Sequence, residues 1–177
     1  MRLRTKRLLV RPRSLADTES AHSQACREEV SAPAGFLSPR TVSDTRKNIR
    51  RALRDWKKPG FKPMVFSLIL RSKRLWIGGF TLRWPHAGVG EIGYNVHPEH
   101  WGQGYATEAG KAVIDLAFQK FGAHRVQANC WVKNAASIKV LRRIGLKKEG
   151  RLRGYLKRGV VVRDEYQFGM TRQDWAG

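Results

Sequence analysis

The stretch that organises this chain is E-I-G-Y-N-V-H-P-E-H-W-G-Q-G-Y-A-T-E-A, residues 91–109. Its first six residues predict a strand, and residues 101–106 form a glycine-rich turn before a helix predicted over about 107–121. Glycines let the main chain approach an anion closely, and the N–H groups at a helix N-terminus attract phosphate. The turn has neither the G-K-[ST] of a Walker A loop nor a complete G-x-G-x-x-G pattern. It therefore predicts either a phosphate-binding turn or an ordinary tight turn with a helix cap.

The elements around this stretch alternate between strand and helix periodicity. Ser31–Pro39 contains two prolines and a glycine and predicts a loop, and Pro59-Gly60 ends the second helix. This order predicts a mixed sheet flanked by helices. The predicted strands cover 8–10, 64–71, 75–84, 91–96, 124–132, 146–156 and 160–170, and the predicted helices cover 15–27, 43–58, 107–121 and 134–143.

The composition is that of one globular domain. The chain has 177 residues, of which 41% are hydrophobic and 28% charged. No apolar run is long enough to span a bilayer, and the N-terminus lacks the apolar core of a signal peptide, so we expect a cytoplasmic protein without membrane contact. Cys26 and Cys130 form neither a disulfide scaffold nor a metal-ligand spacing, so we expect no metal.

The charge is unusual, because 35 Lys and Arg against 14 Asp and Glu give a net charge of +21. Such a chain favours anionic partners: nucleic acid, a ribonucleoprotein or a phosphate-rich cofactor. Residues 139–158 carry nine basic residues and one acid, Glu149, and one face of the predicted 43–58 helix is also basic. These stretches predict either a solvated surface or a docking surface for RNA or the ribosome.

Residues 91–109 resemble the acetyl-CoA site of the GNAT acetyltransferase superfamily. The stretch H-R-V-Q-A-N-C-W-V-K-N-A-A-S-I-K-V-L-R-R-I-G-L-K-K-E-G at 124–150 resembles the second half of that fold. Within the superfamily, R-L-R-T-K-R-L-L-V-R-P at 2–12 and G-Y-L-K-R-G-V-V-V-R-D-E-Y at 154–166 resemble the RimJ/RimL type, which acetylates ribosomal-protein N-termini. The resemblance implies an α/β (α+β) fold in a single domain over 1–177. Its mixed, mostly antiparallel sheet would have six to seven strands, with about four flanking helices.

The resemblance also implies acetyl-CoA as co-substrate. The main chain of Val96 would pair with the pantetheine arm, Asn134 would bond that arm, and Ser137 would lie near the thiol. Trp101 stands where the superfamily often has Gln or Arg, which removes one charged phosphate contact. Lys139, Arg142 and Arg143 are candidates to replace that contact at the adenosine 3′-phosphate. The residues implied to surround the pyrophosphate are Trp101, Gly102, Gln103, Gly104, Tyr105, Ala106 and Thr107.

Acetyl transfer to an amine needs a base, a group that polarises the thioester and an acid for the leaving thiolate. Glu91 is the candidate base, acting through water, and its alternative role is an ordinary salt bridge. Ser137 is the candidate acid, or it merely bonds the cofactor. Tyr155 is a second candidate acid, or it packs in the core or substrate pocket. Main-chain N–H groups near Val96 and His97 are candidates to polarise the thioester.

The remaining candidates read as structural. Cys130 follows the alternation of a core strand and has no paired histidine that would make it a nucleophile. Asp164 and Glu165 lie among arginines and predict ion pairs.

Three functions remain open from the sequence. The first is acetylation of the N-terminal α-amine of a ribosomal protein. The second is acetylation of a small amine, such as an antibiotic or polyamine, or of aminoacyl-tRNA. The third is a ribosome- or RNA-binding protein that keeps the fold without turnover, against which the intact loop at 101–107 argues. The sequence allows a monomer or a homodimer.

Overall fold

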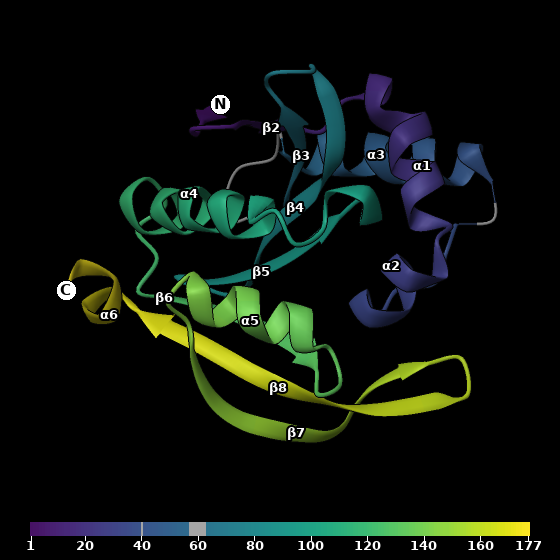
Figure 1. Ribbon diagram of the computed structural model, residues 1–177. Coiled ribbons are helices and arrows are strands. Elements are labelled where there is room, and N and C mark those ends of the chain that lie inside the picture. The colour runs from purple at the N-terminus through teal and green to yellow at the C-terminus, as the bar shows by residue number, and fades with distance from the viewer. Residues whose placement is uncertain (40, 57–62) are drawn as a thin grey trace.

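The computed structural model describes residues 1–39, 41–56 and 63–177. Its centre is an eight-stranded sheet with the order β1-β2-β3-β4-β5-β6-β8-β7, in which only β5 and β6 run parallel (Figure 1). The strands are β1 (Leu3–Arg4), β2 (Leu8–Pro12), β3 (Met64–Leu70), β4 (Leu75–His86), β5 (Val89–Val96), β6 (Arg125–Trp131), β7 (Lys147–Arg158) and β8 (Val161–Thr171).

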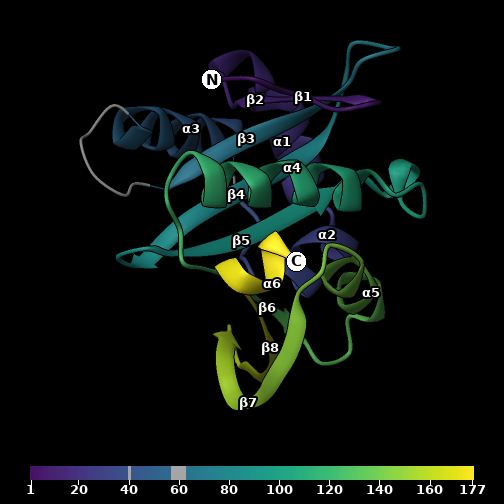
Figure 2. The same cartoon turned by 90° about the vertical axis from the view of Figure 1, so that its left-hand side faces the viewer.

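Helices cover both faces of this sheet (Figure 2). Helices α1, α2 and α3 lie on one face, and α4, α5 and α6 lie on the other. The helices are α1 (Thr18–Ala25), α2 (Glu28–Ala34), α3 (Val42–Trp56), α4 (Tyr105–Gln119), α5 (Ala135–Arg143) and α6 (Arg172–Ala176), with 3-10 turns η1 (Leu15–Asp17) and η2 (Pro98–His100).

The predicted mixed α/β fold is confirmed, with corrections to the number of elements. The described residues form eight strands rather than six to seven, and six α-helices rather than about four. The two-residue β1 and the five-residue α6 are too short to give a periodic signal. Residues 57–58 and 59–60, predicted as the end of a helix and its stop, lie outside the described residues.

The loop predicted over Ser31–Pro39 is wrong for its first part, because α2 extends to Ala34 despite Pro33. Gly35 ends this helix in the left-handed conformation, with φ 77°. The Arg163 guanidinium, from β8, donates to the carbonyl oxygens of Ala32 at 2.6 Å and Pro33 at 3.2 Å. Hydrogen bonds from a distant strand thus satisfy two carbonyl oxygens at the C-terminal end of α2, whose usual partners four residues later lie beyond the helix.

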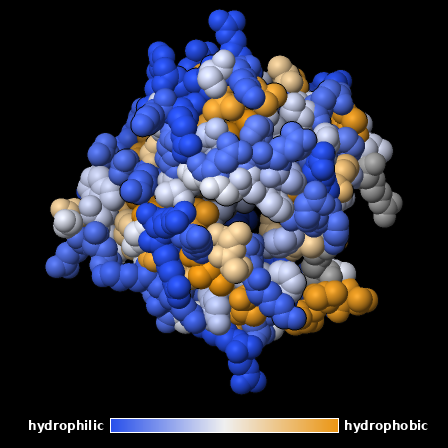
Figure 3. All heavy atoms as spheres, viewed as in Figure 1, coloured by the Kyte–Doolittle hydropathy of each residue, from blue (hydrophilic) through white to orange (hydrophobic). Residues whose placement is uncertain are grey.

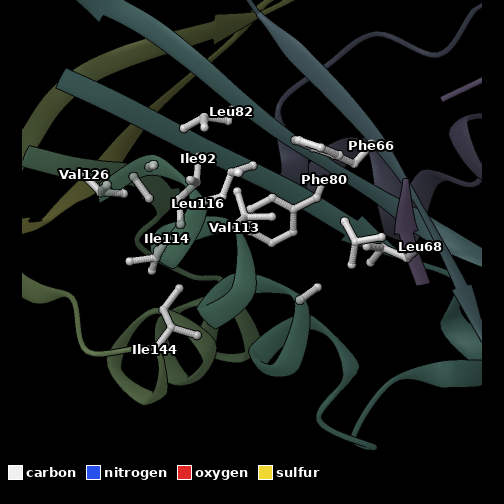
Figure 4. Close-up of a cluster of buried hydrophobic side chains, with 14 of the residues drawn as sticks. Phe66, Leu68, Phe80, Leu82, Ile92, Val113, Ile114, Leu116, Val126 and Ile144 are labelled. Carbon is white, nitrogen blue, oxygen red and sulfur yellow. The ribbon is translucent and has the colours of Figure 1, made fainter. Parts of the chain in front are cut away.

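The hydrophobic core lies between the sheet and α4 (Figure 4). Phe66, Phe80 and Leu82 project from β3 and β4 toward Val113 and Leu116 of α4. On β5 the even-numbered residues face this core, whereas Asn95 bonds Gln24 of α1 on the opposite face. The alternation of a strand therefore gives β5 one face toward α4 and α5 and another toward α1 and α2.

Candidate active site

The sheet opens between β5 and β6. These strands pair at three positions, Val89↔Arg125, Gly90↔Val126 and Glu91↔Gln127. Beyond them β5 continues with β4 as far as Val96, and β6 continues with β8 as far as Trp131. The two strands therefore diverge from residue 92 onward, and the molecular surface is hollowed between α4 and α5 (Figure 3).

Main-chain groups of β5 point into this opening. The His97 N–H donates to the Ile77 carbonyl at 2.8 Å, and Val96 lies opposite Gly78. In an antiparallel pair with this pattern, Val96 directs its own N–H and C=O away from β4, toward β6. The His97 N–H is thus bonded within the sheet, so it is not available to polarise a thioester as predicted. The Val96 N–H, by contrast, points into the opening.

The glycine turn joins the end of β5 to α4 and has the conformation its sequence requires. Gly102 and Gly104 have φ values of 74° and 80°, which L side chains rarely adopt. Gly104 is the N-cap of α4, so the helix begins at Tyr105, two residues earlier than predicted. The first N–H groups of a 15-residue helix therefore face the mouth of the opening.

Trp101 joins the glycine turn to β5 by a hydrogen bond. Its indole N–H donates to the Val96 carbonyl oxygen at 2.6 Å, and about half of its side chain is exposed. The indole ring therefore occupies a main-chain acceptor of β5 and supplies no charge.

A cation reaches this turn from the N-terminal strands. Arg7 donates through Nε to Glu108 at 2.7 Å and through Nη1 to the Gln103 carbonyl at 2.9 Å. Its guanidinium lies 4.4 Å from the centre of the Tyr105 ring. Sequence reasoning missed Arg7 because it is 96 residues from Gln103 and no local pattern marks it. Lys139, Arg142 and Arg143, the predicted cations, lie on the exposed part of α5.

Asn134 and Ser137 come together at the start of α5, as predicted for a helix cap. The Asn134 Oδ1 accepts from the Ser137 N–H at 3.0 Å. The Ser137 hydroxyl lies 2.9 Å from the hydroxyl of Tyr94, which sequence reasoning did not single out. Burial raises the pKa of Tyr94 well above its usual value, against the opposing effect of the Ser137 hydrogen bond. Tyr94 therefore stays neutral and can exchange a proton with Ser137 only as a hydroxyl.

Cys130 is buried, as its alternation predicted. Burial, and secondarily Glu165, raise the pKa of its thiol to about 11. A thiol with such a pKa is protonated at neutral pH and is a poor nucleophile.

Glu91 lies on the other face of β5 from Tyr94 and Ser137. Its carboxylate accepts from Arg83 at 2.7 Å and from the Gln127 amide at 3.3 Å, and 18% of its side chain is exposed. The salt bridge considered as its alternative role is therefore present, while the carboxylate keeps access to solvent. The structure does not bring Glu91 and Ser137 into contact.

Tyr155 lies apart from these residues. It is on β7, at the far edge of the sheet and three strands from β5, with 53% of its surface exposed. Asp164 and Glu165 form the predicted ion pairs, with Arg151 and Arg163 respectively. Within residues 1–39, 41–56 and 63–177, no group of three His, Cys, Asp or Glu side chains could hold a metal ion. No helix in the described parts of the chain is long and apolar enough to cross a membrane.

Comparisons with known proteins agree with this architecture. The model of the acetyltransferase (GNAT) domain matches residues 7–147. The uncharacterized N-acetyltransferase p20 of Bacillus licheniformis is 32% identical over 99% of this chain and 98% of its own. The crystal structure of a GNAT-family acetyltransferase from Bacillus anthracis superposes with a TM-score of 0.85, 25% identity and coverage of 98% and 99%.

Two more distant structures share the fold. They are the spermidine N-acetyltransferase from Vibrio cholerae in complex with CoA and spermine, and RimL, a ribosomal L7/L12 α-N-protein acetyltransferase, in complex with CoA. Both have a TM-score of 0.84, with 15% and 16% identity and coverage of at least 97% of each chain. From the matched domain and the full-length relatives, this chain belongs to the GNAT acetyltransferase family and is an N-acetyltransferase.

Proposed function

We propose that this enzyme transfers the acetyl group of acetyl-CoA to the N-terminal α-amine of a protein, with ribosomal proteins as the first candidates. The observation that carries the cofactor part is the opening between β5 and β6, which ends at a left-handed glycine turn and a helix N-terminus. An extended arm bearing a pyrophosphate fits such a site, because main-chain groups line the opening and N–H groups stand at its mouth. The CoA complexes of the two distant neighbours support this cofactor.

Each predicted cofactor residue has a place in this proposal. The main chain of residues 102–107 binds the pyrophosphate, and the Val96 N–H pairs with the pantetheine arm near its thioester. Asn134 fixes the start of α5, and its remaining amide group bonds the arm. Arg7, which is paired with Glu108, places its guanidinium beside the turn, where Trp101 supplies no charged group.

The catalytic roles follow from the two faces of β5. Glu91, on the face toward α1 and α2, accepts the amine proton through a water molecule, and Arg83 holds its carboxylate in place by a hydrogen bond at 2.7 Å. Ser137, on the opposite face, donates a proton to the departing thiolate and regains one from solvent, while the neutral Tyr94 hydroxyl at 2.9 Å orients the serine hydroxyl. The Val96 N–H stabilises the oxyanion of the tetrahedral intermediate. We prefer Ser137 to Tyr155 as the acid, because Tyr155 lies three strands away.

The basic surface supports a ribosomal setting. Arg46, Lys47, Arg50, Arg51 and Arg54 are exposed on α3, and with a net charge of +21 they favour an anionic partner such as ribosomal RNA. We propose that this face brings the enzyme to its protein substrate.

A small amine or aminoacyl-tRNA is the alternative acceptor. The neighbour that acts on spermidine supports the first of these. A polycation would need free carboxylates to bind. The carboxylates of Glu91 and Glu165 on the sheet are already paired with Arg83 and Arg163, which argues against such a substrate.

The test is to incubate the enzyme with labelled acetyl-CoA and a cell lysate and to locate the label. Label in an RNase-resistant, protease-sensitive band of the size of a ribosomal protein supports the proposal. Label released by RNase identifies aminoacyl-tRNA, and label in the small-molecule fraction identifies a small amine. If acetyl-CoA binds and no label is transferred, either the lysate lacks the acceptor or the protein binds acetyl-CoA without turnover, and either result contradicts a ribosomal-protein acceptor present in that lysate.

A further inference from the structure

A polar cluster lies on the α1 face of the sheet, beside the end of β5. Asn95 precedes Val96, and its Oδ1 accepts a hydrogen bond from the Gln24 amide of α1 at 3.0 Å. Gln24 is 2% exposed, and its Oε1 has no partner among the described residues. A buried amide oxygen without a partner is costly, so it indicates a group that is still to bind.

Arg13 extends into the same place from the residue after β2. Gly79 of β4 pairs with Asn95, so both residues belong to the same face. A Cβ atom at Gly79 would lie 2.0 Å from Nη2 of Arg13 and 3.3 Å from its Cζ. The absence of a side chain at Gly79 therefore leaves the space that the Arg13 guanidinium occupies next to Asn95.

The charge of Arg13 is not matched within the described part of the chain. Its Nε atom is buried without a hydrogen-bond partner. The carboxylate that acts on it is Asp17, but Asp17 already binds Arg11 at 2.6 and 2.8 Å and accepts from Ser67 at 2.9 Å. Burial lowers the pKa of Arg13 to about 10, with Asp17 opposing, so the side chain stays protonated at pH 7. Two guanidinium groups therefore lie near one carboxylate, and Arg13, whose side chain is half-buried, keeps a positive charge that no hydrogen-bonded carboxylate among the described residues balances.

We propose that Arg13, Gln24 and Asn95 form an acceptor subsite that binds a carboxylate carried by the amine substrate. The proposal rests on the proposed function, and it names the chemical class of the acceptor. The guanidinium supplies charge-assisted hydrogen bonds to the carboxylate, and the two amides supply a donor and an acceptor for the polar groups near it. Because Asn95 adjoins Val96, an acceptor bound here has its amine close to the acetyl group. A polyamine has no carboxylate to pair with the guanidinium of Arg13.

The carboxylate has two sources that one experiment separates. Initial rates are measured with acetyl-CoA and paired acceptors that differ only in charge: peptides beginning with aspartate or glutamate against asparagine or glutamine, and free amino acids against their amides. The carboxylate member is expected to have a kcat/KM higher by about 10- to 100-fold, the range for a charge-assisted hydrogen bond. Preference in the peptide pairs identifies a side-chain carboxylate, and preference in the amino-acid pairs identifies an α-carboxylate.

The variant Arg13→Gln tests which residue produces the preference. It is expected to bring both members of a pair within about twofold of each other, with acetyl-CoA affinity unchanged by calorimetry. Arg74→Gln, an exposed arginine in the β3–β4 turn, removes the same charge as a control and is expected to keep the preference. Gly79→Ala, which displaces the guanidinium without removing its charge, is expected to weaken the preference as well. Circular dichroism and a thermal melt confirm that each variant is folded.

The outcomes separate the subsite from the proposed function. Acetylation of every acceptor without a preference for carboxylates overturns the subsite and leaves the transferase intact. A preference that survives in Arg13→Gln overturns the role of that arginine. Acetyl-CoA binding without acetylation of any amine, by the enzyme as isolated, overturns the proposed function and the subsite that rests on it.

Discussion

Glu108 joins the N-terminal strands to the glycine turn, and replacing it with Gln tests how much that junction stabilises the fold. Its carboxylate accepts from the Thr5 hydroxyl at 2.5 Å, from the Arg7 main-chain N–H at 2.7 Å and from the Arg7 Nε at 2.7 Å. The Glu108 side chain is 16% exposed and that of Arg7 is 40% exposed. The hydrogen bonds from the Thr5 hydroxyl and the Arg7 main-chain N–H are thus shielded from water, whereas the ion pair with the Arg7 guanidinium is partly screened by solvent.

The expected loss is about 2 kcal/mol. A hydrogen bond to a charged group contributes about 1.5–3 kcal/mol to the free energy of unfolding. Gln keeps one neutral acceptor oxygen, so the variant retains part of this stabilisation. The ion pair with the exposed Arg7 adds less than about 1 kcal/mol. A loss of about 2 kcal/mol in a domain of this size lowers Tm by about 4–8 °C. In a urea titration at pH 7, the midpoint should fall while the slope stays unchanged.

The effect should also depend on pH. Burial opposes the shift, but hydrogen bonds from Thr5 and Arg7 dominate together and lower the pKa of Glu108 below 4.5. The stabilisation is therefore complete above the unfolded pKa and is lost as the pH falls through the lower folded value. The parent and Glu108→Gln should converge in acid. Glu99→Gln, a 78% exposed glutamate near the same turn, is the control. Equal midpoints for Glu108→Gln and the parent at pH 7, or a difference that persists in acid, would refute the reasoning.

Three further predictions concern the catalytic proposal. Gly104→Val places a β-branched residue at φ 80° and should abolish acetyl-CoA binding, measured by calorimetry; undiminished binding contradicts the phosphate-turn assignment. Glu91→Gln should lower kcat by about 10²–10⁴-fold with acetyl-CoA affinity unchanged, because it removes the base and keeps the shape; kinetics equal to the parent remove Glu91 from that role. Ser137→Ala should lower kcat by at least about 10-fold and leave the Asn134 cap intact, as checked by thermal melts. An unchanged kcat would show that another group protonates the thiolate.

The parts of the site that the sequence predicted are those in which the signal and the structure are local. The turn at 101–106 joins strand to helix within a few residues, and its glycines report a left-handed backbone directly. Asn134 lies three residues before the N–H that it caps. In both cases residues close together in the chain determine the local conformation, so a single sequence is enough to predict it.

The parts that were missed depend on contacts between distant segments. Pro33 lies inside α2 because Arg163, 130 residues later, bonds the end of that helix. Arg7 reaches the glycine turn, and Arg13 reaches Gly79, only after the sheet has formed. Helix α6 is the exception: Thr171 and Asp174 form a capping box that the T-x-x-D spacing could have revealed.

The opening between β5 and β6 has a consequence for how the molecule unfolds. Strands β1–β5 and β6–β8 form two runs of antiparallel pairing that meet in the sheet at three residue pairs. Regions joined so narrowly tend to open as separate cooperative units, with amide protons at the seam exchanging before those at the centre of either run. A molecule bound along β5 and the start of α5 would bridge the two units. Binding should therefore slow exchange on both sides of the seam together and merge their unfolding into one transition.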